Sequence, residues 1–340
     1  MGEFDLIARY FKRPTHRAAL GIGDDCALLQ PAPGCQLAIS SDMLVQGRHF
    51  FADVDPRTLG HKALAVNLSD LAACGAKPLA FTLALSLPEV NELWLEAFSQ
   101  GLFTLADTHG CELIGGDTTA GPLNICITVF GEVPVLGGRS QALLRSGAKA
   151  GDDLYVSGTI GDARLALDLL LGNLQPSPAP QDAALTQALS AARARLETPT
   201  PRVGLGLALR GIASAAIDVS DGLLGDLGHI LEHSQVGATV FADEAIQSIA
   251  AYAYSKRATG QFSMNFSTEQ WRALALAGGD DYELLFTAPA SLRDAVQAAA
   301  LASQTPVRRI GHIDAGPGLR VLDAQGQLLP NRYASFDHFA

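Results

Sequence analysis

The chain has 340 residues, long enough for two domains of ordinary size, and 48% of them are hydrophobic, which predicts a large buried core. Its formal charge is −11 and it has no run of lysine or arginine, so a nucleic-acid backbone is not expected as a partner. The five cysteines form no C-x-x-C pair, which is typical of buried thiols in a reducing compartment.

The first eleven residues contain acidic side chains and lack the basic and apolar segments of a signal peptide. No apolar run in the sequence approaches the length that spans a bilayer. We therefore expect a cytoplasmic protein without a membrane partner.

Apolar spacing predicts alternating helices and strands in the first part of the chain. In chain order these are a helix over 3–12, a strand over 37–40, a helix over 58–73, a strand over 79–86, a helix over 90–108 and strands over 111–114 and 123–133. A polar segment then runs from Gly137 to Lys149. We therefore expect a boundary there, between domains of residues 1–140 and 141–340.

The second part repeats the mixture of strands and helices. It is expected to contain a strand over 154–157, a helix over 163–171, a proline-containing loop over 174–180, a helix after Arg202, a strand over 214–219, helices over 221–234 and 271–277, and a strand over 282–287. Both parts together indicate a two-domain fold of the α/β or mixed α+β class.

Three familiar binding-site or catalytic patterns can be compared with the sequence. The dipeptide Gly-Lys is absent from the sequence, which excludes a Walker A loop, and Gly21-Ile22-Gly23 lacks the third glycine of a dinucleotide fingerprint. His229, Glu232 and His233 match the zinc-protease pattern H-x-x-E-H on an expected helix. That pattern leaves the third metal ligand unspecified, and a solvated helix face is the alternative interpretation.

Aspartates beside glycine or serine recur along the whole chain. They lie in the segments 23–25, 40–42, 67–70, 115–117, 218–222 and 278–281. One aspartate at the end of a strand is ordinary turn chemistry, but six such clusters indicate oxygen ligands for hard cations such as Mg²⁺. Asp218 and Asp221 flank Ser220 at an expected strand-to-helix turn, where helix N–H groups favour anions.

Several of these segments carry a family resemblance. They are GIGDDCA (21–27), LAISSD (37–42), KALAVNLSDLAA (62–73), LIGGDTT (113–119), AIDVSDGL (216–223), DYEL (281–284) and FDHF (336–339). In this order, over nearly the whole chain, they resemble the thiamine-monophosphate kinase family, within the aminoimidazole ribonucleotide synthetase-like superfamily.

The resemblance implies a two-domain aminoimidazole ribonucleotide synthetase-like fold and a homodimer. Residues 1–140 would bind ATP and magnesium and would pair with a second subunit to form a β-barrel. Residues 141–340 would form the α/β domain that completes the active-site cleft.

The resemblance also implies roles for individual residues. The magnesium ligands would be Asp25, Ser40, Ser41, Asp42, Asp70, Asp117, Asp218 and Asp221. ATP would contact Gly116, Asp117, Arg145 and Ser220, and thiamine monophosphate would contact His49, Asp280 and Phe336. Asp24 adjoins this set without an assigned role. Asp280 stands where the family usually has glutamate, and Ser41 where threonine is common.

The reaction implied is the last step of thiamine diphosphate biosynthesis, in which the γ-phosphoryl group of ATP moves onto the phosphate of thiamine monophosphate. The acceptor oxygen is already anionic near neutral pH, so the transfer would be assisted by several Mg²⁺ ions and would need no catalytic acid or base. The alternatives are a purine-pathway synthetase or selenophosphate synthetase of the same superfamily, a nucleotide-sensing protein without turnover, and a zinc hydrolase using His229, Glu232 and His233.

Overall fold

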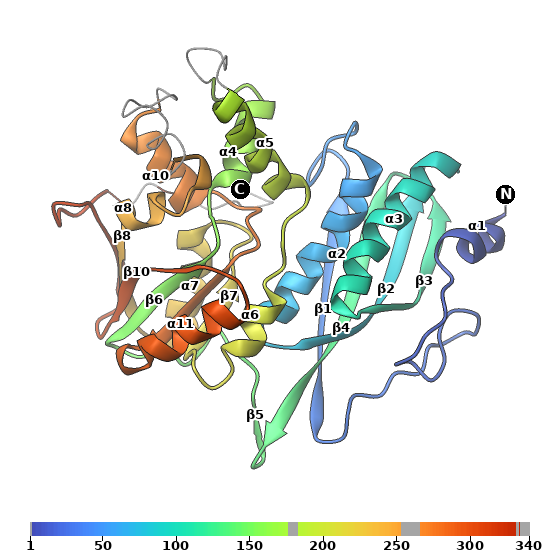
Figure 1. The fold of residues 1–340 in the computed structure, drawn as a ribbon, viewed down its shortest axis with the longest axis horizontal. Coiled ribbons are helices and arrows are strands. Elements are labelled where there is room, and N and C mark those ends of the chain that lie inside the picture. Colours follow the sequence, from blue (N-terminus) through green and yellow to red (C-terminus); the bar gives the residue numbers. More distant parts are fainter. Residues whose placement is uncertain (1, 176–182, 253–265, 331–332, 334–340) are drawn as a thin grey trace. The chain divides into compact units, whose positions relative to one another are not determined.

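The computed structural model describes residues 2–175, 183–252, 266–330 and Tyr333 (Figure 1). The chain divides into two compact units, Met1–Ala142 and Leu143–Ala340. Each unit has its own mixed sheet with helices packed against it. None of the helices in the described ranges is long and apolar enough to cross a membrane.

The first unit contains a five-stranded sheet in the order β1-β4-β2-β3, with the short β5 paired to β4. Its elements are α1 (Glu3–Tyr10), β1 (Cys35–Val45), α2 (Pro56–Ala73), β2 (Lys77–Leu87), α3 (Glu92–His109), β3 (Glu112–Ala120), β4 (Asn124–Leu136) and β5 (Arg139–Ser140). β2 and β3 are parallel and are connected through α3, whereas β4 runs antiparallel to both β1 and β2.

Helices α2 and α3 lie side by side against the sheet (Figure 1). The start of α2 follows from local chemistry, since Asp55 accepts a hydrogen bond from the Arg57 N–H and Pro56 occupies the first turn. The two helices approach closely at two glycines. A Cβ atom on Gly60 would lie 2.1 Å from the Phe98 carbonyl oxygen, and one on Gly101 would lie 1.8 Å from that of Arg57.

The second unit contains a six-stranded sheet in the order β11-β8-β10-β6-β9-β7. Its elements are β6 (Asp152–Ser157), α4 (Asp162–Leu170), α5 (Ala183–Glu197), α6 (Val203–Ala208), β7 (Ala215–Asp218), α7 (Leu223–Ser234), β8 (Gly237–Phe241), α8 (Ala242–Ile246), α10 (Thr268–Ala277), β9 (Leu284–Pro289), the 3₁₀ turn η1 (Ala290–Leu292), α11 (Arg293–Ala302), β10 (Val307–Asp314) and β11 (Gly318–Leu322). Only the β8–β11 pair is parallel among the described pairs of this sheet.

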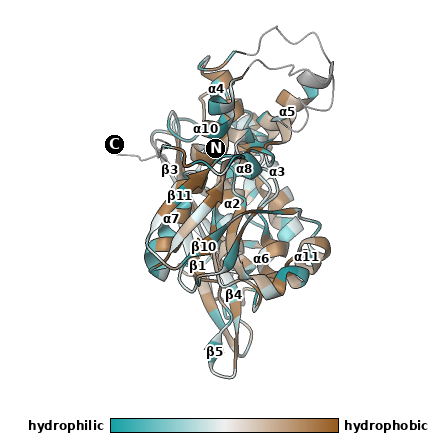
Figure 2. Cartoon of the chain, turned by 90° about the vertical axis from the view of Figure 1, so that its left-hand side faces the viewer, coloured by the Kyte–Doolittle hydropathy of each residue, from teal (hydrophilic) through white to brown (hydrophobic). Residues whose placement is uncertain are grey.

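The core of the second unit is built from the sheet and the inner faces of its helices. Trp271 of α10 is almost fully buried and makes edge contacts with Tyr252 and Phe266. Helix α11 buries Val296 and Ala299 and leaves its other side to solvent, and Figure 2 shows both hydrophobic and hydrophilic colours on it.

The expected helices and strands are confirmed in kind, and two of them differ in length in a way that matters for the site. Residues 176–180 of the expected loop lie outside the described residues. The strand expected over 37–40 runs on to Val45, so Asp42 lies inside β1 instead of after it. The strand expected over 111–114 continues through Gly115 and Gly116, so Asp117 also lies inside a strand. Sequence analysis missed α5, α8, α11, β8, β10 and β11, and α11 begins without a side-chain cap that would have marked it.

Candidate active site

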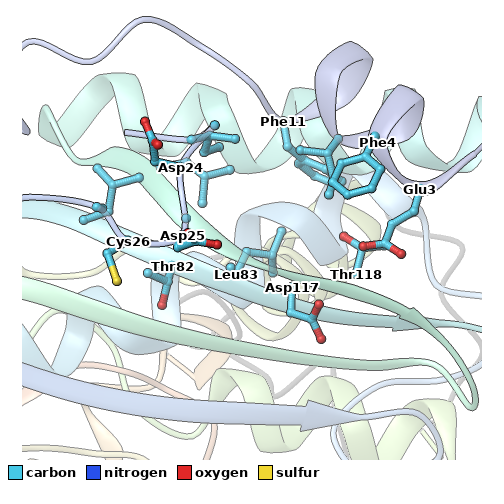
Figure 3. A pocket seen from close by; sticks show the side chains of 18 residues that line it. Glu3, Phe4, Phe11, Asp24, Asp25, Cys26, Thr82, Leu83, Asp117 and Thr118 are labelled. Atoms are coloured by element: carbon cyan, nitrogen blue, oxygen red, sulfur yellow. The ribbon is translucent and has the colours of Figure 1, made fainter. Parts of the chain in front are cut away.

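In the first unit a cavity of about 610 Å³ lies beside β3 (Figure 3). Asp24 and Asp25 line it from the loop before β1, and Gly116 and Asp117 line it from β3. Helix α1 contributes Glu3 and apolar side chains to the wall. Four carboxylates therefore line the same cavity. Two of them, Asp25 and Asp117, were expected from the sequence as magnesium ligands.

Gly116 allows the unusual approach of β3 to β2 at this cavity. Its φ angle is 145°, and a Cβ atom would lie 1.9 Å from the Leu83 carbonyl oxygen. No side chain fits that space, so backbone packing alone requires glycine at position 116. The consequence is a fixed position for Asp117, whose side chain is exposed.

A second set of expected ligands lies where β1 faces α2. The Ser40 hydroxyl donates a hydrogen bond of 2.5 Å to a carboxylate oxygen of Asp70 on α2. The backbone N–H of Asp42 donates to the Asn67 side-chain oxygen at 3.0 Å. Helix α2 therefore fixes both the side chain of Ser40 and the backbone beside Asp42.

The strand register separates these residues from Asp117. Asp117 is aligned with Ala84, and Ala84 with Cys126. Cys126 is in turn aligned with Met43, the residue after Asp42. Aligned side chains share a face of the sheet and successive ones alternate, so Asp117 and Asp42 project from opposite faces.

Ser41 lies on the face away from Ser40 and Asp42. Its hydroxyl donates to the Ile127 carbonyl oxygen at 3.2 Å and lies 3.0 Å from the Thr128 hydroxyl. His49 follows β1 in a turn, where its Nδ1 accepts a 3.0 Å hydrogen bond from the Val45 N–H. The structure therefore distributes the β1 residues over two faces, which the adjacent positions in sequence do not reveal.

In the second unit Asp218 is the last residue of β7, and the loop that follows carries Ser220 and Asp221. A single oxygen of Asp226, on α7, accepts hydrogen bonds from the N–H groups of Ser220, Asp221 and Gly222 at 3.1, 3.2 and 3.1 Å. Burial and then the charge of Asp221 raise the pKa of Asp226 to about 6. Asp226, which sequence analysis missed, therefore holds the loop in shape.

Asp280 lies next to this loop. Its N–H donates to the Ser220 carbonyl oxygen at 2.8 Å, and the Tyr282 N–H donates to that of Val219, also at 2.8 Å. The Val219 N–H donates back to the Glu283 carbonyl oxygen. Ser220 and Asp221, expected to contact ATP and metal, and Asp280, expected to contact the acceptor, therefore belong to one hydrogen-bonded arrangement.

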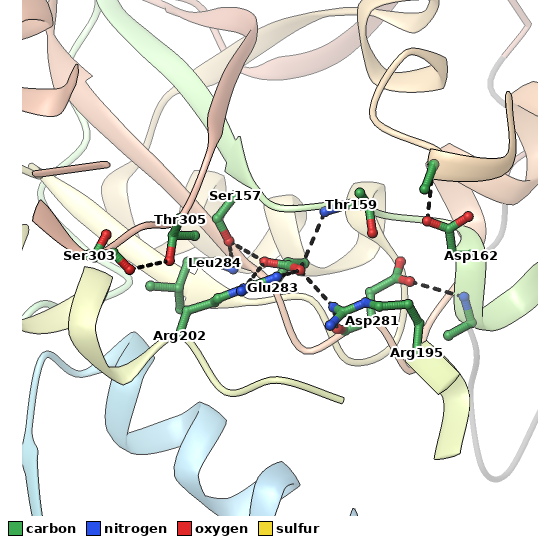
Figure 4. A network of polar contacts seen from close by, with 12 residues as sticks. Ser157, Thr159, Asp162, Arg195, Arg202, Asp281, Glu283, Leu284, Ser303 and Thr305 are labelled. Carbon is green, nitrogen blue, oxygen red and sulfur yellow. Dashed lines mark hydrogen bonds and ion pairs between the residues drawn. The ribbon is translucent and has the colours of Figure 1, made fainter. Parts of the chain in front are cut away.

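A buried ion cluster centred on Glu283 follows Asp280 in the chain (Figure 4). The carboxylate accepts hydrogen bonds from Arg195 at 2.6 Å, from Arg202 at 2.5 and 2.6 Å, and from the Ser157 hydroxyl at 2.6 Å. Asp281 is buried beside it and accepts a 2.7 Å bond from the Gly161 N–H, and its burial raises its pKa. Sequence analysis noticed the DYEL segment but gave no role to these carboxylates or arginines.

Arg145 and Phe336 were also expected to contact ligands. The side chain of Arg145 is exposed, and its carbonyl oxygen accepts a hydrogen bond from the Ser234 hydroxyl. Phe336 lies outside the described residues.

Side chains that could bind a metal ion are spread out in the described part of the chain. Over residues 2–175, 183–252 and 266–330, no group of three or more His, Cys, Asp or Glu side chains is gathered closely enough to hold a metal ion. On α7 the His233 Nδ1 lies 2.8 Å from the His229 carbonyl oxygen, and both histidines are exposed. The described part of the chain therefore offers no third ligand for the zinc alternative.

Comparison with known proteins places this chain in a family. Residues 23–133 match the family described as "AIR synthase related protein, N-terminal domain", and residues 149–324 match its C-terminal domain. The thiamine-monophosphate kinase of Salmonella typhimurium is 47% identical over 100% of this chain and 98% of its own length. The chain belongs to the thiamine-monophosphate kinase family.

Solved structures of the thiamine-monophosphate kinase family agree with this assignment. The enzyme from Stenotrophomonas maltophilia K279a is 46% identical, with a TM-score of 0.78 and 96% of each chain covered. The structure "AaThiL complexed with AMPPCP and TMP" is 27% identical, with a TM-score of 0.70 over 91% of this chain and 89% of that one. The resemblance inferred from the sequence motifs is confirmed, as is the two-domain mixed fold of the superfamily.

The role of Asp226 leads to a stability prediction. Asp226→Ala leaves three partly buried N–H groups without their acceptor, so the free energy of unfolding should fall by about 2 kcal/mol. Asp226→Asn keeps an acceptor oxygen and should lose less than about 1 kcal/mol. Urea unfolding followed by circular dichroism measures both.

Asp323→Ala is the matched control for this prediction. Asp323 also accepts two backbone N–H groups, from Gln325 and Gln327, but in an exposed turn where water can replace it. Its loss should be under about 1 kcal/mol. Equal losses for Asp226→Ala and Asp323→Ala would contradict the special role of Asp226.

Proposed function

We propose that the protein transfers the γ-phosphoryl group of ATP to the phosphate of thiamine monophosphate, forming thiamine diphosphate and ADP. The observation that carries the proposal is the relatedness over the full chain to thiamine-monophosphate kinases. A family member with the same fold is described as complexed with AMPPCP and TMP. We retain the sequence-based expectation of a cytoplasmic enzyme acting at the last step of thiamine diphosphate biosynthesis.

The proposed ATP contacts are Gly116, Asp117, Arg145 and Ser220, and the proposed acceptor contacts are His49, Asp280 and Phe336. Two features of the second unit support the assignment there. The Asp280 N–H is bonded to the Ser220 carbonyl oxygen, which sets a proposed acceptor contact beside a proposed ATP contact. The N–H groups at 220–222 already bind one carboxylate oxygen, which shows that this loop favours anions.

Magnesium is proposed to be held by carboxylate and hydroxyl oxygens. The proposed ligands are Asp25, Ser40, Ser41, Asp42, Asp70, Asp117, Asp218 and Asp221. These donors suit Mg²⁺, which prefers oxygen and is usually shared with substrate phosphates. Bound between phosphates, the ions would supply positive charge that neutralises the transferring group.

The residues of the chain then act by binding and orientation. The monoester phosphate of the acceptor has a second pKa of about 6, so its attacking oxygen needs no general base near neutral pH. Repulsion between two unit charges about 4 Å apart is roughly 4 kcal/mol at an effective dielectric constant near 20. Holding both phosphates in line against that repulsion is the main work of the site.

The first test is substrate choice. Purified protein should release ADP from ATP with thiamine monophosphate and should be inactive with free thiamine, aminoimidazole ribonucleotide precursors or selenide. EDTA should stop the reaction, Mg²⁺ should restore it, and Zn²⁺ alone should not. Activity on thiamine only, or restoration by Zn²⁺ alone, would contradict the proposal.

The second test concerns the carboxylates of the first unit. Asp42→Asn and Asp117→Asn should each lower kcat/KM by about 100-fold or more, because each removes a negative charge that would hold a magnesium ion beside the transferring group. Steady-state kinetics over a range of Mg²⁺ concentrations measures this. Asp107→Ala is the control, since its exposed ion pair with Arg13 contributes little. Full activity of both Asn variants at limiting Mg²⁺ would refute the ligand assignment.

We also propose that two copies pair through the open face of β1. Leu37, Ile39 and Met43 are 39%, 60% and 51% exposed on this edge strand, and they alternate with the residues that face α2. An apolar strip of this kind suits a second copy of the same sheet, as in the expected β-barrel.

Sedimentation velocity tests the pairing. The wild type should be a dimer, Ile39→Lys should be a monomer because it places a charge in the apolar strip, and Leu301→Lys should remain a dimer. Leu301 is a suitable control because it is 79% exposed on α11. A dimer that survives Ile39→Lys would place the interface elsewhere.

A further inference from the structure

The segment that carries Asp280 has an unusual backbone. Asp280 and Tyr282 have φ angles of 65° and 51°, two of the four positive values among the non-glycine residues that the structure describes. The left-handed region costs roughly 1–2 kcal/mol for such residues and is rare for a bulky side chain such as tyrosine. A strained conformation persists only where its surroundings impose it, and such segments cluster at functional sites.

Buried side-chain contacts hold the segment in this conformation. The alternate residues Asp281 and Glu283 point into the core, where Gly161, Arg195 and Arg202 bind their carboxylates (Figure 4). Both carboxylate side chains are completely buried. The segment is therefore anchored at every second residue.

Backbone hydrogen bonds to the loop after β7 also fix the main chain of this segment. The N–H groups of Asp280 and Tyr282 donate to the carbonyl oxygens of Ser220 and Val219, each at 2.8 Å. The strained residues are thereby held at a set distance from the loop that contains Ser220. A relaxed backbone at 280 or 282 would break these bonds.

The conformation brings two side chains together. The Tyr282 hydroxyl donates a 3.1 Å hydrogen bond to Oδ1 of Asp280. Tyr282 is only 8% exposed, so its ring has little freedom, whereas Asp280 is half-buried and can reach a ligand. A buried ring thus fixes the direction of a carboxylate at the surface of the site.

We propose that Tyr282 is a positioning residue that aims the Asp280 carboxylate at the cationic thiamine part of the acceptor. This inference rests on the proposed function, because it takes Asp280 as an acceptor contact. A carboxylate suits both the thiazolium charge and the amino group of the pyrimidine. An aspartate is short, so a fixed direction decides whether it reaches either group.

Tyr282→Phe tests the inference with the smallest change, the loss of one hydroxyl. It should lower kcat/KM for thiamine monophosphate about tenfold, mainly through KM, which is the scale of one hydrogen bond to a charged group. The KM for ATP and the thermal midpoint should stay as in the wild type. A purely structural role for Tyr282 would instead lower the thermal midpoint and affect both substrates.

Tyr155→Phe is a closely matched control. The Tyr155 hydroxyl also donates to an aspartate two residues earlier, Asp153, at 3.2 Å, and Tyr155 is buried in β6. This substitution removes the same group from the same kind of contact at a distance from the 280–283 segment in sequence. It should leave the KM values of both substrates unchanged.

A double-mutant cycle shows whether Tyr282 acts through Asp280. Asp280→Gly removes the carboxylate and accepts a positive φ without strain. In that background Tyr282→Phe should have less than a twofold effect on kcat/KM for the acceptor. A full tenfold effect there, or no effect of Tyr282→Phe in the wild-type background, would overturn the inference while wild-type turnover of thiamine monophosphate leaves the proposed function standing. Absence of wild-type turnover would overturn both.

Discussion

The buried carboxylate of Glu283 is the interaction on which the second unit's site depends most. Two arginines and a serine hydroxyl bind it, and its main chain continues directly into the strained segment at 280–282. A buried charge whose partners are removed costs about 3–5 kcal/mol, so this cluster tolerates little rearrangement. It therefore holds Asp280 and, through backbone hydrogen bonds, the loop at 218–221 in one arrangement.

The first unit solves a different physical problem, the placement of several carboxylates that repel one another. Strand alternation puts Asp42 and Asp117 on opposite faces of the sheet, and Ser40 binds Asp70 on the face that α2 covers. The expected carboxylate ligands of this unit therefore lie in two places, one where β1 faces α2 and one at the cavity beside β3.

Sequence patterns predicted much of this architecture because the early strands and helices have regular apolar spacing and clear end signals. α2 begins at Pro56, and α3 ends at His109, where Gly110 forms a left-handed cap, both close to the ends expected at 58 and 108. The strand ends were less predictable. Gly115 and Gly116 look like a turn, yet they continue β3, and at Gly116 the neighbouring β2 lies so close that no side chain fits.

The site was predictable as a set of segments but not in its internal order. Arg195 and Arg202 escaped notice because each binds a carboxylate more than 80 residues away, and no local spacing marks such a partner. Asp226 lies only four to six residues from the N–H groups that it binds, but an aspartate in the first turn of a helix is common and does not single it out. The opposite facing of Ser40 and Ser41 also needed the strand register, since neighbours in sequence do not reveal which face is covered. The motifs identified the family, whereas tertiary contacts define how each residue is held.

In the proposed reaction the γ-phosphoryl group moves directly from ATP to the phosphate of thiamine monophosphate. ATP labelled with ³²P at the γ position tests it most directly, with the products separated by chromatography. The account predicts that the label appears in the terminal phosphate of thiamine diphosphate, in amounts equal to the ADP formed. Label found in inorganic phosphate, with thiamine monophosphate unchanged, would contradict it.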